Sequence, residues 1–361
     1  MTSRPEASEV LPRLPAGARV LTIRLRSLGD LVLTLPALSA VHAWRPDLRL
    51  VLAVEPAYEE LFRSHPAVAA VLPVQSFLSA VRQIRAGGFA VAYNLHGGPT
   101  SGLLLAASGA PVRVSWMRSR FARAANVRVP GPEAFFGARA VHTAEHRLTP
   151  FYWTGLPPGS VPPASVPVEP AAVESVRRRL QVCGIGDGVP YALLRPGARR
   201  QPQRWPLERF ARLAEQLAAR GLIPVVNFGP GEEVLRAEFV ERWPRAAVVL
   251  AGLRLSELAA LAARARLFVG NDSGPTHLAA AVGCPVVALF GPTCAAWWRP
   301  WTASYRLVQP ECACGPVPPE RCRRQPDRPC LHSVSVEQVA QACQELLAET
   351  EPTGQGAKLS D

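Results

Sequence analysis

The chain has 361 residues, which is enough for two domains of ordinary size. Hydrophobic residues make up 48% of it and charged residues 19%, and this balance excludes a disordered chain. The 40 basic residues outnumber the 28 acidic ones for a formal charge of +12, and Lys358 is the single lysine. This arginine excess favours phosphates, anionic lipid or nucleic acid as partners, although a genome whose base composition favours arginine gives the same excess.

No membrane-spanning segment is expected, because no stretch approaches about 20 uncharged apolar residues. The most apolar run near the start, residues 20–41, is interrupted by Arg24, Arg26 and Asp30. Residues 1–14 contain no apolar core of the kind that a signal peptide needs. We therefore expect a cytoplasmic protein.

Apolar runs alternate with segments of helical spacing along the first 110 residues. The predicted strands cover residues 20–25, 48–54, 68–72 and 89–95. The predicted helices cover residues 31–44, 58–63, 77–86 and 100–108. Strands and helices in strict alternation predict an α/β fold with a parallel, doubly wound sheet.

Arginines and aromatic residues are mixed along residues 111–150. The mixture can hold a sugar phosphate or a nucleic acid, but a solvated arginine-rich face has the same composition. The Pro-rich residues 156–170 are then predicted to form an interdomain linker.

After this linker strands and helices alternate again, so we expect a second α/β domain. The predicted strands are residues 191–194, 223–228, 267–270 and 286–290. The predicted helices are residues 173–182, 207–220, 234–241, 256–265 and 276–281.

The most informative stretch of the second domain is the polar turn that follows strand 267–270. Backbone N–H groups at the start of the next helix, together with the helix dipole, form an anion site. Ser273 and Gly274 would therefore hold a phosphate, while Asp272 would take a hydroxyl or an N–H group. A tight turn without a ligand remains the alternative.

Asp30 follows Gly29 at the end of the first predicted strand, where the next helix begins. A carboxylate in this position suits a general base that accepts a proton from a hydroxyl. An N-cap carboxylate without a catalytic role would look the same in the sequence, so both interpretations stay open.

Other candidates follow two strands of the second domain. The loop of residues 195–205 carries four arginines, which suit a diphosphate: Arg195, Arg199, Arg200 and Arg204. Glu232 and Glu233 follow strand 223–228, where they could accept hydrogen bonds from a ribose or simply be first-turn helix acids.

Two motifs are absent from the sequence. Without an Asp-x-Asp pair, no acidic pair is available to hold a divalent ion on a diphosphate. Without Gly-x-Gly-x-x-Gly after the first strand, a dinucleotide dehydrogenase is disfavoured. A reaction that releases a nucleoside diphosphate would then depend on the arginine loop and the helix N-terminus.

Four of the eight cysteines gather near the C-terminus, at Cys312, Cys314, Cys322 and Cys330. Their spacing lacks the Cys-x-x-Cys pairs of a structural zinc site. Bound zinc, reduced thiols and a local disulfide all stay open.

Two separated motifs resemble glycosyltransferase family 9, the lipopolysaccharide heptosyltransferase family. The first comprises Arg24-Leu25-Arg26-Ser27-Leu28-Gly29-Asp30 with Thr34–Leu38, and the second comprises Gly270–His277 with Phe290–Thr293. The similarity runs over nearly the whole chain. It implies a GT-B fold, in which two Rossmann-like domains face each other across a cleft. It also implies ADP-L-glycero-β-D-manno-heptose as donor, inversion at the anomeric carbon, and no bound metal or other cofactor.

By the same resemblance, Asp30 matches the family's catalytic base, and Gln203 stands where the family usually has a phosphate-binding lysine. The implied nucleotide-sugar contacts are Arg199, Arg200, Gln203, Arg204, Glu232, Glu233, Asp272, Ser273, Gly274 and His277. The expected acceptor contacts are Arg26, Arg113, Arg118 and Arg120. Because Gln203 is neutral, charge stabilisation is left to the neighbouring arginines.

We expect residues 1–160 to form the acceptor domain and residues 161–335 the nucleotide-sugar domain. Helix 336–348 could pack back on the N-terminal domain, and residues 349–361 are expected to be disordered.

The implied reaction is transfer of a heptose to the lipopolysaccharide inner core, with lipid A/Kdo or heptose as acceptor. The basic charge would suit a loose attachment to the cytoplasmic face of the inner membrane. A transferase with another nucleotide sugar or acceptor and a non-catalytic nucleotide-sugar binder are the alternatives. No nucleic-acid partner is expected.

Overall fold

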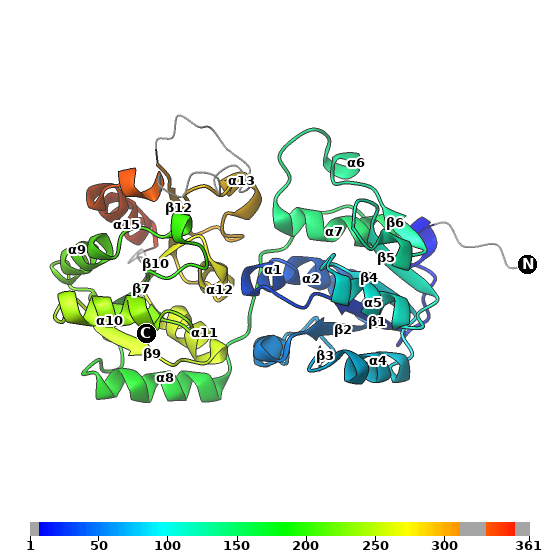
Figure 1. Cartoon of the computed structure of the whole chain (residues 1–361), viewed down its shortest axis with the longest axis horizontal. Helices are drawn as coiled ribbons and strands as arrows, with labels where there is room; N and C mark the ends of the chain where they lie inside the picture. The colour runs from blue at the N-terminus through cyan, green and yellow to red at the C-terminus, as the bar shows by residue number, and fades with distance from the viewer. Residues whose placement is uncertain (1–6, 311–329, 351–361) are drawn as a thin grey trace, which may run out of the picture.

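The protein consists of two α/β domains, each built on one six-stranded sheet (Figure 1). The computed structural model describes residues 7–310 and 330–350. The N-terminal sheet contains β1 (Arg19–Ile23), β2 (Arg49–Val54), β3 (Ala70–Pro73), β4 (Val91–Asn94), β5 (Val112–Trp116) and β6 (Val127–Val129). The C-terminal sheet contains β7 (Tyr191–Arg195), β8 (Ile223–Phe228), β9 (Val248–Ala251), β10 (Leu267–Asn271), β11 (Val286–Leu289) and β12 (Tyr305–Val308).

Both sheets are parallel and have the strand order of a Rossmann fold. The N-terminal order is β3-β2-β1-β4-β5-β6, and the C-terminal order, β12-β11-β10-β7-β8-β9, is the same pattern read from the other edge. In such sheets ligands bind beyond the carboxyl ends of the strands, where the strand order reverses. The binding edges therefore lie between β1 and β4 in one domain and between β7 and β10 in the other, so the predicted α/β class and GT-B fold are confirmed.

Helices cover the faces of both sheets. Those of the N-terminal domain are α1 (Leu28–Val32), α2 (Leu35–Trp44), α3 (Glu59–Phe62), α4 (Phe77–Ala86), α5 (Pro99–Ala107), α6 (Glu133–Phe136) and α7 (Thr143–Trp153). Those of the C-terminal domain are α8 (Pro170–Val182), α9 (Leu207–Ala218), α10 (Glu233–Arg242), α11 (Leu255–Arg264), α12 (Gly274–Ala281), α13 (Ala295–Trp298) and α15 (Val336–Thr350). Between α7 and α8, residues 156–169 form neither helix nor strand.

The helix predicted for residues 31–44 is divided into α1 and α2. The Thr34 hydroxyl donates to the backbone carbonyl of Asp30 at 2.8 Å, and Pro36 has no N–H group with which to continue the helical ladder. The chain therefore turns between the two helices. As a result, Asp30 lies inside the short helix α1 that follows β1 directly.

The C-terminal helix α15 packs on the C-terminal domain, so the expectation that it packs back on the N-terminal domain is wrong. Its neighbours are α9, β11 and β12. The buried side chains of Val339, Cys343 and Leu346 recur at helical spacing, and they complete the core between α9 and the sheet edge. The helix continues through Thr350, and residues 351–361 lie outside the described part of the chain.

The two domains meet where α1 faces α12 (Figure 1). On one side of this contact, the Glu60 carboxylate of α3 accepts hydrogen bonds from the N–H and the hydroxyl of Ser256, at 3.1 and 3.0 Å. On another, His142 Nε2 hydrogen-bonds the carbonyl of Arg299 at 2.9 Å, and its ring stacks on Trp301 with centroids 4.5 Å apart. These polar contacts fix the relative orientation of the domains.

We predict that Leu346→Ala loosens the C-terminal domain alone. The side chain is fully buried, so truncation should cost about 2–5 kcal/mol through the cavity that it leaves. Hydrogen exchange should become faster in β11, β12 and α9 and stay unchanged in β1 and β4. Leu347→Ala, which removes the same atoms from a partly buried position, serves as the milder control. Faster exchange in the N-terminal sheet would contradict the packing described above.

Candidate active site

Asp30 is held by two buried arginines at the carboxyl end of the N-terminal sheet. Its Oδ1 atom lies 2.5 Å from Arg24 Nη2 and 2.8 Å from Arg147 Nη2. The two guanidiniums also converge on the carbonyl of Leu95, to which Arg24 and Arg147 donate at 2.6 and 3.3 Å. Arg24 follows β1 and Arg147 comes from α7, so the carboxylate joins parts of the chain that are distant in sequence.

The second carboxylate oxygen of Asp30 accepts a hydrogen bond from the Ser27 hydroxyl at 3.0 Å. Burial raises the pKa of Asp30, but the charges of Arg24 and Arg147 and the Ser27 hydrogen bond outweigh it and hold the pKa below its ordinary value. The side chain keeps 18% of its surface exposed. Asp30 is therefore an oriented, ionised carboxylate that a hydroxyl can still reach, which a general base requires.

The N-terminus of α12 lies directly against α1. A Cβ atom added to Gly274 would be 2.8 Å from Leu28 Cβ and 3.2 Å from the backbone nitrogen of Gly29, so only glycine allows this approach. A Cβ atom on Gly29 would likewise lie 2.7 Å from His277 Cδ2. The structure thus brings the predicted anion site of Ser273 and Gly274 next to the helix that carries Asp30.

His277 is buried in this contact between α1 and α12. Burial lowers its pKa to about 4, so the imidazole is neutral at physiological pH. Among residues 7–310 and 330–350, no group hydrogen-bonds its Nδ1 atom. His277 therefore packs against the backbone of Gly29, next to Asp30, and its Nδ1 atom has no hydrogen-bond partner within the described residues.

Gln203 bridges Asp272 and the loop after β11. Its amide nitrogen donates to Asp272 Oδ2 at 2.9 Å and to the Thr293 hydroxyl at 3.0 Å. Burial raises the pKa of Asp272 to about 6, although the hydrogen bonds from Thr293 and Gln203 and the charge of Arg200 act in the opposite direction. A neutral amide in contact with Asp272 thus leaves this acid close to half-protonated near pH 6.

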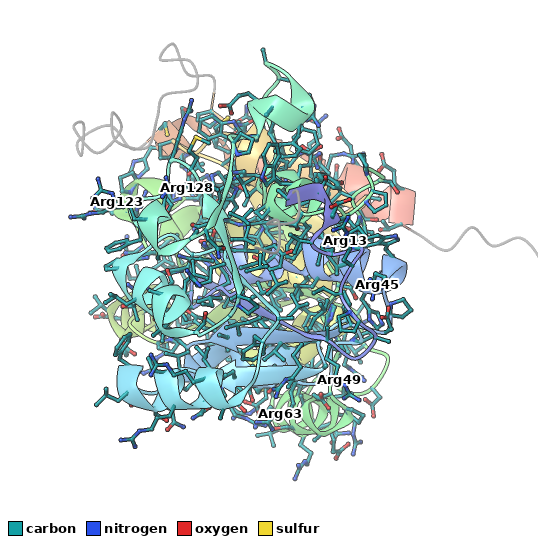
Figure 2. All side chains as sticks on the ribbon, turned by 90° about the vertical axis from the view of Figure 1, so that its right-hand side faces the viewer. Arg13, Arg45, Arg49, Arg63, Arg123 and Arg128 are labelled. Atoms are coloured by element: carbon teal, nitrogen blue, oxygen red, sulfur yellow. The ribbon has the colours of Figure 1, made fainter. Side chains whose placement is uncertain are left out.

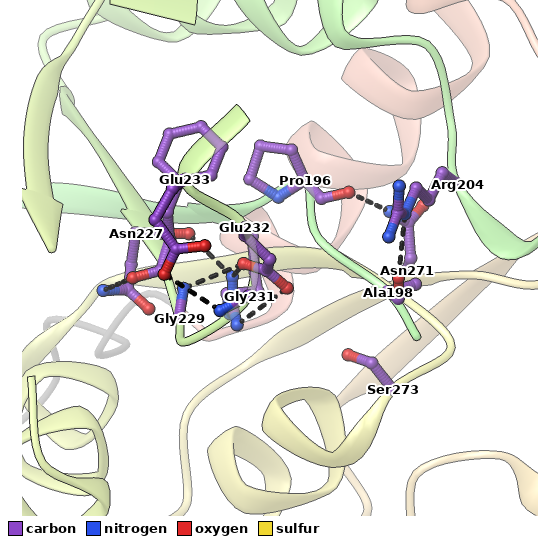
Figure 3. A network of polar contacts seen from close by, with 12 residues as sticks. Pro196, Ala198, Arg204, Asn227, Gly229, Gly231, Glu232, Glu233, Asn271 and Ser273 are labelled. Atoms are coloured by element: carbon purple, nitrogen blue, oxygen red, sulfur yellow. Dashed lines mark hydrogen bonds and ion pairs between the residues drawn. The ribbon is translucent and has the colours of Figure 1, made fainter. Parts of the chain in front are cut away.

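The loop between β7 and α9 is anchored to the last residue of β10, Asn271 (Figure 3). Asn271 donates through its amide to the carbonyl of Pro196 at 2.6 Å and accepts the N–H of Trp205 at 3.0 Å. Arg204 spans the loop and donates to the carbonyl of Ala198 at 2.8 Å. The guanidinium of Arg204 is therefore partly used to hold the loop.

Arg199 and Arg200 lie exposed on the same loop. Within the described residues, neither guanidinium makes a hydrogen bond or an ion pair. Of the predicted phosphate contacts, these two side chains are accordingly the ones free to meet an incoming anion.

Glu232 is oriented toward the loop after β7, whereas Glu233 is not (Figure 3). The Glu232 carboxylate pairs with Arg195 and accepts the N–H of Gly229 at 2.8 Å. It also covers Gly197, where an added Cβ atom would come within 2.0 Å of its Oε1 atom. Glu233 is exposed and accepts only a local N–H. Of the two candidates, Glu232 is the one positioned at the binding edge.

The predicted acceptor arginines do not form one cluster. Arg113 lies on β5 and donates to the carbonyls of Ala124 and Ala110, at 3.0 and 2.9 Å. Arg26, Arg118 and Arg120 are exposed. Arg26 pairs with Glu55 at 3.6 Å, and Arg118 pairs with Glu133 at 3.4 Å. Figure 2 shows that further arginines, such as Arg123 and Arg49, lie on different sides of the N-terminal domain.

Arg147, the second partner of Asp30, was missed by the sequence analysis as a site residue. Its guanidinium also lies over the Trp116 ring, 5.3 Å from the centroid. The pattern that could have found it is the mixture of arginines and aromatics between residues 111 and 150. No feature of this segment distinguishes Arg147 from its arginine neighbours before the fold is known.

The part of the chain that the structure describes contains no group of three or more His, Cys, Asp or Glu residues that could hold a metal ion. Cys312, Cys314 and Cys322 lie outside the described residues. In the same described part, no helix has the length and apolar character needed to cross a membrane.

We predict that Gln203→Lys lowers the pKa of Asp272. In the wild type the folded-state pKa of about 6 lies above the ordinary value of 3.8, so the folded protein binds the proton more tightly than the unfolded chain. Stability should therefore fall as the pH rises from about 4 to 6, because the buried acid must ionise. A lysine in hydrogen-bond reach favours the carboxylate and should reduce this fall.

The measurement is a carbon-13 NMR titration of the Asp272 carboxyl, together with urea unfolding at pH 4, 5, 6 and 7. Gln201→Lys adds the same charge at an exposed position of the same loop and serves as the control. An Asp272 pKa that is identical in all three proteins would show that residue 203 does not determine it.

Known proteins resemble the chain over most of its length. A sequence model of glycosyltransferase family 9 (heptosyltransferase) matches residues 77–326. Lipopolysaccharide heptosyltransferase 3 of Escherichia coli K12 is 27% identical over 346 residues, which cover 91% of this chain and 98% of that protein.

Solved structures of similar fold cover about the same span. A glycosyl transferase of family 9 from Veillonella parvula superposes with a TM-score of 0.80 at 21% identity, covering 92% of this chain and 98% of the other. The Escherichia coli heptosyltransferase WaaC with ADP-2-deoxy-2-fluoro heptose superposes with a TM-score of 0.67 at 20% identity, covering 91% of this chain and 99% of the other. The family match spans more than half of the sequence, and the fold and the whole-length relative agree with it: this chain is a glycosyltransferase that belongs to family 9, the heptosyltransferases.

Proposed function

We propose that this protein transfers a heptose from ADP-L-glycero-β-D-manno-heptose to the lipopolysaccharide inner core, with inversion at the anomeric carbon and without a metal ion. The observation that carries the proposal is the contact between the two domains. There the ionised carboxylate of Asp30 lies on a helix packed against the N-terminus of α12. A base and an anion site from different domains are thereby brought together, as transfer from a nucleotide sugar requires.

The donor would lie mainly on the C-terminal domain. The N–H groups at Ser273 and Gly274 would hold the diphosphate, and the exposed guanidiniums of Arg199 and Arg200 could approach it from the loop after β7. Glu232 would accept the ribose hydroxyls. The similar fold of a heptosyltransferase that holds an ADP-heptose analogue supports this placement.

The acceptor would approach Asp30 from the N-terminal domain. Its hydroxyl oxygen forms a bond to the anomeric carbon while the bond from that carbon to the ADP oxygen breaks on the opposite face. The electron pair of the broken bond leaves with ADP, and the hydroxyl proton passes to Asp30. Arg24 and Arg147 make Asp30 a weak base. Its contribution to catalysis therefore depends on its position beside the hydroxyl, which becomes more acidic as its oxygen bonds to the anomeric carbon.

Charge on the leaving ADP would be stabilised by the helix N-terminus and the free arginines. These groups support the metal-independent part of the proposal, since they can supply positive charge to the diphosphate. The acceptor would be presented at the cytoplasmic face of the inner membrane, where the formal charge of +12 favours an anionic surface.

The contact between Gln203 and Asp272 favours a second candidate function. The amide of Gln203 occupies the place of the family's phosphate-binding lysine, and it is hydrogen-bonded to Asp272. This change could serve a different nucleotide sugar, or a protein that binds a nucleotide sugar without turnover. A panel of nucleotide sugars, assayed for both binding and release, separates these possibilities.

We predict that Asp30→Asn lowers heptosyl transfer by about 10²- to 10⁴-fold, the usual contribution of a general base. ADP release from ADP-heptose would be measured with heptose-free and heptose-bearing inner-core acceptors. The affinity for ADP-heptose should change little, because the donor contacts lie on the other domain. Asp187→Asn removes an exposed aspartate that pairs with Arg264 and Arg177, and it should leave transfer unchanged.

Asparagine leaves Arg24 and Arg147 without a buried anion, so thermal unfolding of the variant must be checked alongside. If a folded Asp30→Asn protein that binds the donor retains wild-type transfer, Asp30 is not the base. If wild type binds ADP-heptose but releases no ADP with any inner-core acceptor, the acceptor part of the proposal is wrong.

A further inference from the structure

A cavity of about 620 Å³ lies between the α6–α7 segment of the N-terminal domain and helix α13 of the C-terminal domain. The ribbons of these helices are labelled in Figure 1. The lining of the cavity includes Glu133, Arg139, Thr143 and His146 on one side and Trp297 and Trp298 on the other. We call it the α6–α13 cavity. Its volume lies within the range of about 300–1,000 Å³ that small-molecule sites occupy. None of the predicted donor contacts lines it.

The C-terminal wall of the cavity is aromatic. Trp297 leaves 42% of its surface exposed, which is unusual for so large an apolar side chain. A flat indole is a suitable surface for the C–H face of a pyranose ring, because both are apolar while the ring hydroxyls point outward to polar groups.

The N-terminal wall offers a neutral hydrogen-bonding group. The His146 ring stacks on Trp116, with centroids 4.8 Å apart. Burial, assisted by the charge of Arg147, lowers the pKa of His146 to about 4, so the imidazole can both donate and accept at physiological pH. Within the described residues no hydrogen bond engages its ring nitrogens, and these are therefore available to sugar hydroxyls.

The charged residues of the lining are already paired. Arg139 contacts Glu145 at 2.6 Å, and Glu133 lies 3.4 Å from Arg118. An acidic sugar would therefore find no unpaired cation among the side chains that line the cavity. A neutral, hydroxylated ring fits this charge balance better.

The cavity lies beside the catalytic carboxylate. His146 directly precedes Arg147, and Arg147 contacts both Asp30 and the Trp116 ring. The hydrogen bond from His142 to the carbonyl of Arg299 joins the two segments that carry the walls, since these residues adjoin Thr143 and Trp298 of the lining. The cavity thus depends on the same domain arrangement that assembles the active site.

We propose that the α6–α13 cavity is an acceptor subsite that holds a neutral pyranose ring stacked on Trp297. The acceptor would then carry a neutral sugar, such as a heptose, next to the sugar that Asp30 activates. This inference rests on the proposed heptosyl transfer and narrows its acceptor: a heptose-bearing core oligosaccharide is favoured over one with acidic Kdo sugars alone.

The first test is calorimetric titration with two delipidated oligosaccharides, one heptose-bearing and one with Kdo only. The heptose-bearing probe should bind wild type more tightly than the Kdo probe. Trp297→Ala should weaken its binding about 3- to 10-fold, the value of an aromatic contact. Trp297→Tyr should retain most of the affinity, since it keeps a stacking ring.

Phe77→Ala removes a comparably exposed aromatic side chain from α4 and serves as the matched control, with no effect expected. In turnover assays, Trp297→Ala should raise KM for the heptose-bearing acceptor while KM for ADP-heptose and kcat stay within about twofold of wild type. A higher KM for the acceptor with an unchanged kcat and donor KM distinguishes weaker acceptor binding from a general disturbance of the fold.

Equal binding of the heptose-bearing probe by wild type and Trp297→Ala would overturn the proposal, as would tighter binding of the Kdo-only probe. Failure of the proposed function looks different. Wild type would then release no ADP from ADP-heptose, while the titration would still report whether the saccharide binds through Trp297.

Discussion

The ion cluster of Asp30 with Arg24 and Arg147 is the interaction on which the active site depends. Three charged groups with little exposure to water are stable only when they satisfy one another, because an unpaired buried charge costs several kcal/mol. The cluster therefore fixes α7 against the end of β1. Because His142 and His146 lie on or beside the same helix, this placement also sets the interdomain hydrogen bond to Arg299 and one wall of the α6–α13 cavity.

Close backbone contact adds the second constraint. Gly29 and Gly274 let α1 and the N-terminus of α12 approach to a distance at which any side chain would collide with the opposite helix. Other contacts between the domains are polar, such as those of Glu60 with Ser256, or aromatic, such as the stack of His142 on Trp301. Together these contacts hold the domains in the arrangement that places Asp30 beside the N-terminus of α12.

The sequence allowed the fold and much of the candidate site to be predicted because those features are local. The polar turn after β10 and the acid after β1 lie where a strand gives way to a helix, a boundary that composition reveals. Arg147 could not be assigned, since it meets Asp30 across 117 positions of sequence. Helix α7 contains Pro150, and β6 spans only Val127–Val129, so residues 111–150 showed no clear elements. The position of α15 could not be predicted either, because the sequence does not show which of the two domain cores lacks a covering helix.

In the proposed donor site, the neutral Gln203 leaves less positive charge for a diphosphate than a lysine would. Arg195 is committed to Glu232 and Arg204 to its own loop, so neither guanidinium is fully available to a phosphate. A permanent cation beside Asp272 would keep that acid ionised, whereas the amide leaves its pKa raised to about 6. A partly neutral acid repels a diphosphate less than a carboxylate does. If the proposed diphosphate binds at this turn, the weaker negative charge of Asp272 would offset part of the missing lysine charge, and the exposed Arg199 and Arg200 would supply positive charge.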